Sequence, residues 1–129
     1  MLRRIETEAA SRPFSKYAQA IVVDPGSRLV FVAGQVGADK EGNIADTPAQ
    51  QHRLAWENVL AILKAAGMDH NNIVDVHVYV TDRSQTPLFR QIRDEVLGDH
   101  LAASTFLVVA GLADPRLLVE ISVVAAASA

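Results

Sequence analysis

Glu120 is the residue whose surroundings point most directly to chemistry. It lies within Leu117–Ala125, a run rich in Val, Leu and Ile that predicts a β-strand. Because side chains alternate along a strand, Glu120 shares one face with Leu118, Ser122 and Val124. A carboxylate buried among aliphatic groups needs hydrogen bonds, a cation or a raised pKa. On this pattern alone, a glutamate on a solvated face or paired in an interface is the commoner alternative.

The other reactive residue types are not spaced for catalysis or metal binding. The histidines are His52, His70, His77 and His100. They lack a His-x-x-x-His spacing and paired carboxylates, so we expect no metal site and no cofactor. The chain has no cysteine and no serine in a nucleophile elbow, which argues against thiolate and serine-hydrolase chemistry. His77 lies between Asp75 and Tyr79 on one strand face, a trio that favours hydrogen bonding between subunits.

Two helices are predicted to position these residues. The first begins at Thr47-Pro48-Ala49-Gln50, a capping box with Pro at the first helical position, and ends at Gly67. The second begins at Thr86-Pro87, with Thr86 as the cap, and runs to Gly98. Apolar residues at helical spacing give the core faces, which are Ala55, Trp56, Val59, Ile62, Leu63 and Ala66 in the first helix and Phe89, Ile92 and Val96 in the second.

The remaining segments predict strands. Gln19–Val23 and Arg28–Ala33 flank the turn Asp24–Ser27 as a hairpin, and a second hairpin spans residues 104–126. The strand Asn72–Thr81 places Val74, Val76, Val78 and Val80 on one face. Residues 1–16 are expected to be a loosely structured segment with room for one short strand.

The resulting order, β-β-α-β-α-β-β, predicts an α+β fold in which two helices cover one face of a sheet. Leu29–Ala33 and Phe106–Val109 are apolar on both faces. An uncovered apolar face needs a partner, so the sequence predicts an oligomer.

Motifs along nearly the whole chain resemble the RidA/YjgF (Rid) family. They are Tyr17-Ala18-Gln19-Ala20, Ala33-Gly34-Gln35, Asn58, Ala66-Gly67, Val78-Tyr79-Val80-Thr81-Asp82, and a C-terminal signature from Ala103 through Leu107, Ala110 and Leu112 to Val119-Glu120-Ile121. The resemblance implies a single domain over residues 1–129, a chorismate-mutase-like α+β fold, a homotrimer, and a small-molecule cleft between subunits. It also implies that Glu120 orients or activates the water that hydrolyses an imine.

Position 104 departs from the family pattern. The family's active deaminases carry an Arg there, which clamps the substrate carboxylate, and counting back from Ala110-Gly111-Leu112 places Ser104 at that position. A serine hydroxyl has no charge and cannot form the bidentate contact of a guanidinium. Arg90, Arg93 or Arg116 would have to supply a cation instead. Arg90 and Arg93 are the best placed, although solvated helix charges are the commoner alternative.

The resemblance assigns substrate binding to Tyr17, Ala33, Gly34, Ser104, Thr105 and Phe106. Tyr17 can donate a hydrogen bond from a rigid ring, and a core tyrosine is the alternative. Ala33-Gly34 replaces the family's usual Ser-Gly, so one polar contact is lost. Phe106 narrows the cleft where the family often has a small residue, and Gln35 is expected to hold the loop.

Composition narrows the class of protein and partner. The chain has 129 residues, half of them hydrophobic and about a fifth charged, which is typical of one globular domain. A net charge of −3 with no basic run argues against nucleic acid as an obligate partner. No apolar run is long enough to span a membrane, and Met1-Leu2-Arg3-Arg4 lacks the apolar core of a signal peptide. We therefore expect a cytoplasmic protein.

These observations leave hypotheses of different classes. The favoured one is a hydrolase of a small reactive imine or enamine, weak or inactive on 2-imino acids because Ser104 replaces the Arg. One alternative is a non-catalytic trimer that binds a small ligand or a partner protein. A third is a related hydrolysis or isomerisation of a neutral substrate that reuses Glu120. Retention of Glu120 favours an enzyme.

Overall fold

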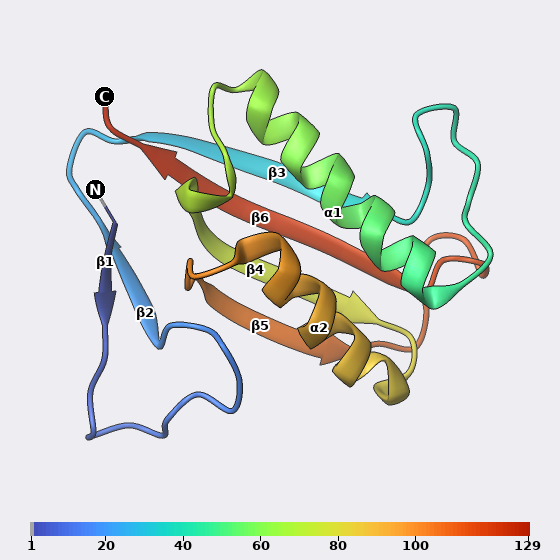
Figure 1. The fold of residues 1–129 in the computed structure, drawn as a ribbon, viewed down its shortest axis with the longest axis horizontal. Coiled ribbons are helices and arrows are strands. Elements are labelled where there is room, and N and C mark those ends of the chain that lie inside the picture. Colours follow the sequence, from blue (N-terminus) through green and yellow to red (C-terminus); the bar gives the residue numbers. More distant parts are fainter. Residues whose placement is uncertain (1) are drawn as a thin grey trace.

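A four-stranded sheet forms the centre of the computed structural model, which describes residues 2–129 (Figure 1). Its strands lie in the order Arg28–Val36 (β3), Val119–Ala127 (β6), Ile73–Val80 (β4) and Ala103–Val108 (β5). β6 is antiparallel to both β3 and β4, whereas β4 and β5 are parallel. Leu2–Ile5 (β1) and Ala20–Val23 (β2) form a separate antiparallel pair, so one strand precedes the expected order.

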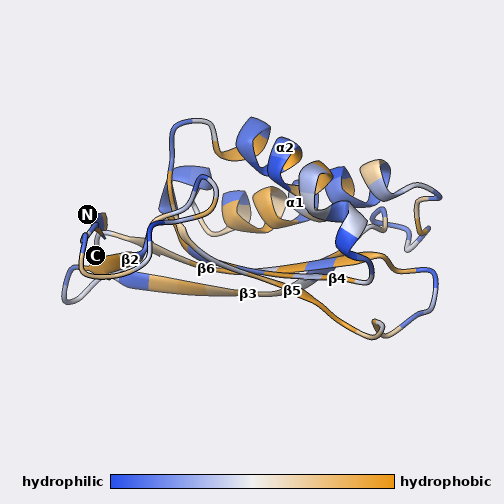
Figure 2. Ribbon diagram, turned by 90° about the horizontal axis from the view of Figure 1, so that it is seen from below, coloured by the Kyte–Doolittle hydropathy of each residue, from blue (hydrophilic) through white to orange (hydrophobic). Residues whose placement is uncertain are grey.

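Both helices cover the same face of the sheet, as the edge-on view in Figure 2 shows. They are Pro48–Ala65 (α1) and Thr86–Leu97 (α2). The predicted α+β fold with two helices on one face is therefore confirmed. Thr47 caps α1 by accepting a hydrogen bond from the Gln50 amide at 3.2 Å, and Gly67 ends it with φ +74°.

The predicted cap of α2 is wrong. Thr86 is the first residue of the helix, and a short 3₁₀ turn, Arg83–Gln85 (η2), precedes it. The Thr86 hydroxyl donates to the Arg83 carbonyl at 2.8 Å, so it stabilises the turn rather than a free helix amide. A second 3₁₀ turn, His70–Asn72 (η1), leads into β4.

The hydrophobic core lies between the helices and the sheet. It contains Trp56, Val59 and Leu63 from α1 and Phe89 and Ile92 from α2. Among the predicted core residues, Ile62 is 38% exposed, and Ala66 and Val96 are only half-buried. Val74 does not share the buried face of Val76, Val78 and Val80, because a register shift between Ile73 and Asp75 turns Ile73 inward in its place.

Neither predicted hairpin forms. The two strands of the C-terminal pair are separated by β4, which pairs with both of them. At Asp24–Ser27 the turn itself is present, with Gly26 at φ +80° and the Ser27 amide donating to the Asp24 carbonyl. However, β2 pairs with β1 while β3 pairs with β6. Both pairings were expected because the strands are close in sequence. The chain instead crosses over and places each of these strands beside a different partner.

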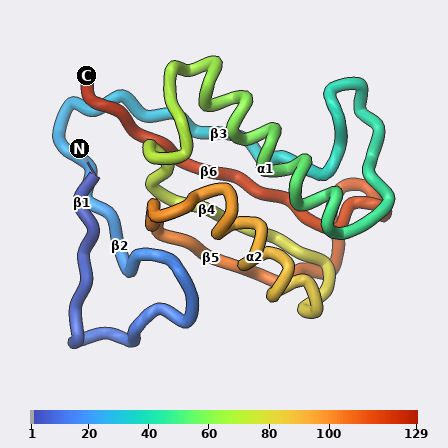
Figure 3. Tube along the Cα trace, in the orientation of Figure 1, coloured from blue at the N-terminus to red at the C-terminus, as the bar shows by residue number. Residues whose placement is uncertain are grey.

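Two long connections, residues 37–47 and 109–118, meet at one end of the sheet (Figure 3). The buried side chain of Gln51 joins them. Its Nε2 donates to the carbonyls of Ala45 at 3.0 Å and Arg116 at 2.9 Å, and its Oε1 accepts from the Leu118 amide at 2.8 Å. These bonds fix the loop that precedes Glu120.

The face of the sheet opposite the helices, here called the open face, carries large apolar side chains. Phe31 is 74% exposed, Leu29 51% and Leu107 48%. This pattern agrees with the prediction that β3 and β5 are apolar on both faces. No helix within residues 2–129 is long and apolar enough to cross a membrane.

Candidate functional site

Glu120 lies half-buried on the open face of β6, as the alternation predicted, since its neighbours Val119 and Ile121 are fully buried on the helix side. It lines a shallow cavity of about 320 Å³, here called the Glu120 depression, together with Gly34, Tyr79 and other residues. Among residues 2–129, nothing donates a hydrogen bond to the Glu120 carboxylate or pairs with it. A carboxylate that is partly desolvated and unpaired is free to accept a proton or to bind water.

Gly34 brings the backbone of β3 directly against this carboxylate. A register shift between Val32 and Gln35 places Ala33 and Gly34 in a bulge beside β6. A Cβ at Gly34 would lie 2.7 Å from the Glu120 Cδ and 2.9 Å from its Cγ, so only glycine leaves the Glu120 side chain in this position. Gln35 holds the bulge by donating to the Ala33 carbonyl at 3.0 Å, which is the loop-holding contact expected of it.

Ser104 and Phe106 lie elsewhere, on the helix side of β5. Their partners on β4, Val76 and Val78, are core residues. Ser104 and Phe106 line a cavity of about 260 Å³ together with Tyr17, Arg90 and Arg93, among others; we call it the arginine pocket. The Phe106 ring contacts the ring of Phe89 at a centroid distance of 5.3 Å, which closes the floor of the pocket.

Tyr17 reaches this pocket because its segment is bound to the edge of β5. The Ala18 amide donates to the Ala102 carbonyl at 2.9 Å, in a parallel bridge to Ala103. The Tyr17 hydroxyl accepts from the Phe14 amide at 3.2 Å, which leaves its own proton able to reach a ligand. This geometry allows the donor role expected of Tyr17.

The three arginines that could replace the missing one differ in whether the guanidinium is free to bind a ligand. Arg93 is 3% exposed; it pairs with Asp94 at 3.0 Å and lies over the Phe89 ring. Arg116 is held by Asp114 and lines neither the arginine pocket nor the Glu120 depression. Its hydrogen bonds lower the pKa of the Asp114 carboxyl to about 2. Arg90 is exposed and lines the arginine pocket.

Thr105 points away from Ser104 and Phe106, because side chains alternate along β5. It is exposed on the open face, opposite His77 of β4. His77 Nε2 lies 2.8 Å from Asp75 Oδ2, so two members of the predicted strand-face trio are paired. The third, Tyr79, lies opposite Glu120 in the ladder.

A single chain therefore does not unite the predicted site residues. Gly34 and Glu120 belong to the Glu120 depression on the open face, whereas Tyr17, Ser104 and Phe106 line the arginine pocket on the helix side. Sequence reasoning missed further lining residues, namely Phe14, Ser15, Thr86 and Phe89 in the pocket and Tyr79 and Ser122 in the depression. Helical spacing of Thr86, Arg90 and Arg93 was the available signal for the pocket.

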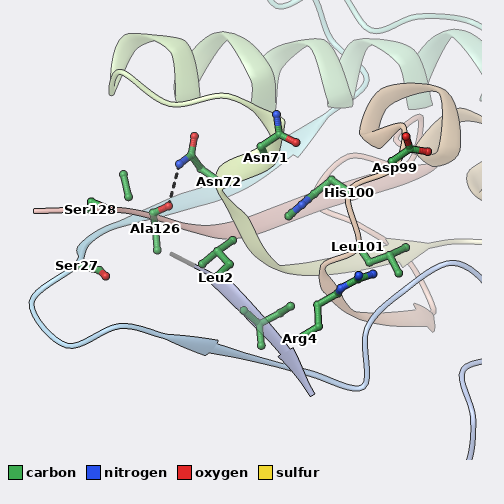
Figure 4. A pocket seen from close by; sticks show the side chains of 12 residues that line it. Leu2, Arg4, Ser27, Asn71, Asn72, Asp99, His100, Leu101, Ala126 and Ser128 are labelled. Atoms are coloured by element: carbon green, nitrogen blue, oxygen red, sulfur yellow. Dashed lines mark hydrogen bonds between the residues drawn. The ribbon is translucent and has the colours of Figure 1, made fainter. Parts of the chain in front are cut away.

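A further cavity of about 510 Å³ lies between the β1–β2 pair and the main sheet (Figure 4). It contains none of the expected site residues. Two of its polar side chains already bind the backbone: Asn72 donates to the Ala126 carbonyl at 3.0 Å, and His100 Nε2 lies 2.7 Å from the Ile73 carbonyl. Within residues 2–129, no group of three or more histidines, aspartates or glutamates is placed to hold a metal ion.

Comparison with known proteins places this geometry in a family. A family model described as Endoribonuclease L-PSP matches residues 7–127. The human protein named 2-iminobutanoate/2-iminopropanoate deaminase is 30% identical over 115 residues, which are 87% of this chain and 82% of the human one. The chain belongs to the RidA/YjgF family.

Solved structures of RidA/YjgF proteins superpose along the whole chain. The Rid-family protein YyfB from Yersinia pestis has a TM-score of 0.84 and 27% identity, covering 96% of this chain and 97% of its own. TdcF from Escherichia coli, solved with bound serine, has a TM-score of 0.74 and 30% identity, covering 98% of this chain and 99% of its own. The resemblance noted in the sequence is thus confirmed.

Proposed function

We propose that this RidA/YjgF protein hydrolyses a small reactive imine or enamine and releases ammonia, with Glu120 as the general base. The observation that carries the proposal is the unpaired carboxylate of Glu120 held against Gly34 in the Glu120 depression. A relative of 30% identity is named as a deaminase of 2-imino acids, and TdcF has been solved with an amino acid bound.

The chemistry requires one base that acts twice. Glu120 accepts a proton from a water molecule as the water oxygen bonds to the carbon of the protonated imine, which gives a tetrahedral carbinolamine. The carboxyl group then returns this proton to the nitrogen. As the carbon–nitrogen bond breaks and the carbonyl forms, Glu120 accepts the hydroxyl proton and passes it to the departing ammonia. The products are a carbonyl compound and ammonium, and Glu120 is ionised again. No metal or redox cofactor is needed for this balance.

We propose that a second copy of the chain completes the site, as part of a homotrimer. The two halves of the site lie on opposite faces of one sheet, so neither can reach the other within a chain. The exposed apolar side chains Leu29, Phe31 and Leu107 on the open face favour contact with a neighbouring subunit. Such contact would bring the arginine pocket of one subunit to the Glu120 depression of the next.

Ser104 limits the substrate. Truncating one member of a buried charge pair costs roughly 2–5 kcal/mol, or about thirty- to several-thousand-fold in binding. We therefore expect weak or no turnover of small 2-imino acids such as 2-iminobutyrate. Tyr17 and the backbone of Ser104–Phe106 are left to bind a small substrate, and we expect neither nucleic acid nor a membrane as an obligate partner.

The test of the proposal is Glu120→Gln, assayed by ammonia release from freshly generated imines with semicarbazide trapping as a check. We expect loss of turnover with a melting temperature close to that of the wild type, because the amide keeps the shape but cannot accept the proton. Glu57→Gln is the matched control, since Glu57 is an exposed carboxylate on α1. Undiminished turnover in a stable Glu120→Gln protein would exclude the catalytic role.

A non-catalytic ligand-binding or partner-binding trimer is the second candidate. Loss of the carboxylate-clamping Arg at position 104 favours it. Under this alternative, wild-type protein would bind a small ligand without accelerating hydrolysis of any imine, and Glu120→Gln would alter only binding.

A further inference from the structure

The arginine pocket contains two cations with very different freedom. Arg93 is buried, its Nε and one terminal nitrogen bind the Asp94 carboxylate, and its other terminal nitrogen donates to the Ser15 hydroxyl at 3.1 Å. Its charge is neutralised, and its donors are used to hold the segment that carries Tyr17. Arg90 is exposed and has no hydrogen bond or ion pair with any residue from 2 to 129.

The helix directs Arg90 toward the same space. Thr86, Arg90 and Arg93 follow one another at spacings of four and three residues along α2, and all three line the arginine pocket. The free guanidinium therefore lies on the helix wall, across the cavity from the strand that carries Ser104. A cation is present in the pocket, on a different wall from the one that the family pattern uses.

The rest of the lining is aromatic. Phe89 and Phe106 form the floor with their rings in contact, and Phe14 is 83% exposed at the same cavity. An apolar cavity of roughly 150 Å³ is enough to hold benzene. The arginine pocket has about 260 Å³, so a ring-sized apolar group and a carboxylate fit together.

We propose that Arg90 binds the carboxylate of the substrate and that the substrate class is imines of carboxylic acids with a ring-sized apolar side chain. This inference rests on the proposed function for its reacting group, but not for its binding step. Arg90 supplies the charge, the aromatic floor binds the apolar side chain, and Ser104 offers space and a neutral hydrogen bond. Small acids lack the side chain needed to bind the floor while they contact the helix wall, which gives a second reason to expect weak turnover of 2-iminobutyrate.

Binding of an unreactive probe tests the inference without turnover. We would titrate the intact protein with 3-phenylpropanoate and with its neutral isostere 3-phenylpropanamide by calorimetry. We expect wild type to bind the carboxylate about tenfold more tightly than the amide, since a charge-assisted hydrogen bond is lost with the amide. Arg90→Gln should abolish this preference, and Arg90→Lys should retain part of it.

Arg83→Gln is the matched control, because Arg83 is an exposed arginine in the 3₁₀ turn before α2 that does not line the arginine pocket. Equal binding of both probes by wild type, absence of binding, or an unchanged preference in Arg90→Gln would each overturn the inference. A preference that depends on Arg90, together with unchanged imine hydrolysis in Glu120→Gln, would support the inference and refute the proposed function. The two failures are therefore distinguishable.

Discussion

Gly34→Ala should separate the position of Glu120 from the stability of the fold. Gly34 does not have a positive φ, so its backbone accepts alanine without strain. The new Cβ would lie 2.7 Å from the Glu120 Cδ and 2.9 Å from its Cγ, well inside van der Waals contact. The Glu120 side chain must therefore move, and its half-exposed position leaves room for it to rotate toward solvent.

The expected changes in rate and in the free energy of unfolding follow from this geometry. Relief of the clash shifts the carboxylate by about 1 Å, and a misplacement of that size costs about a hundredfold in rate. An altered rotamer costs about 0.5–1.5 kcal/mol, whereas replacing glycine with alanine at a compatible position stabilises by about 0.4–1 kcal/mol through the unfolded chain. The two nearly cancel, so we expect the free energy of unfolding to change by less than about 1 kcal/mol.

The assay is kcat/KM for ammonia release from a freshly generated imine, measured together with the thermal unfolding midpoint. Gly111→Ala is the control, because Gly111 lines the same Glu120 depression and a Cβ there meets nothing within 4 Å. A Gly34→Ala protein with normal kcat/KM would refute the reasoning, since turnover would then not depend on where the carboxylate lies.

Three further substitutions test other parts of the account. Ser104→Arg should raise hydrolysis of 2-iminobutyrate by about tenfold through a restored charge-assisted contact, measured as ammonia release, with Phe106 limiting the gain. Phe31→Asp should dissociate the oligomer in analytical ultracentrifugation, whereas Ile62→Asp on the helix side should not; a trimeric Phe31→Asp protein would remove the interface argument. Burial lowers the pKa of His52, although its hydrogen bond to Gln85 Oε1 opposes the shift, so the unfolded chain binds the proton first as the pH falls. The contribution of His52 to the free energy of unfolding should be fully present above pH 6.5 and fall below it by up to about 1.4 kcal/mol per pH unit. His52→Leu should remove that slope in denaturant titrations.

Much of the fold followed from local signals. Helix α1 was predictable because Thr47, Pro48 and Gly67 mark its ends, and alternation in β6 placed Glu120 on the face opposite Val119. Strand pairing was not predictable by the same reasoning. Which strands pair, such as β4 with β6, depends on how the chain crosses over between them. The residue types in the connecting loops do not indicate this path.

The candidate site was predictable by residue but not by arrangement. Family resemblance identified Glu120, Tyr17 and Ser104 from the sequence alone. It did not reveal that Glu120 and Ser104 lie on opposite faces of the sheet, because that depends on the pairing of β5 beside β4. The different availability of Arg90 and Arg93 also required the structure, since only contacts with Asp94 and Ser15 distinguish them.

Complementation between subunits tests the central claim, a Glu120-dependent site shared by two chains, most directly. Glu120→Gln removes one half of the site, and Ser104→Trp fills the arginine pocket that forms the other half. Each variant alone should be inactive. Co-expressed at equal levels, with mixed trimers verified by native mass spectrometry, they should recover about a quarter of wild-type ammonia release, because random assembly pairs two intact halves at that frequency. Mixed trimers that remain inactive would contradict the account.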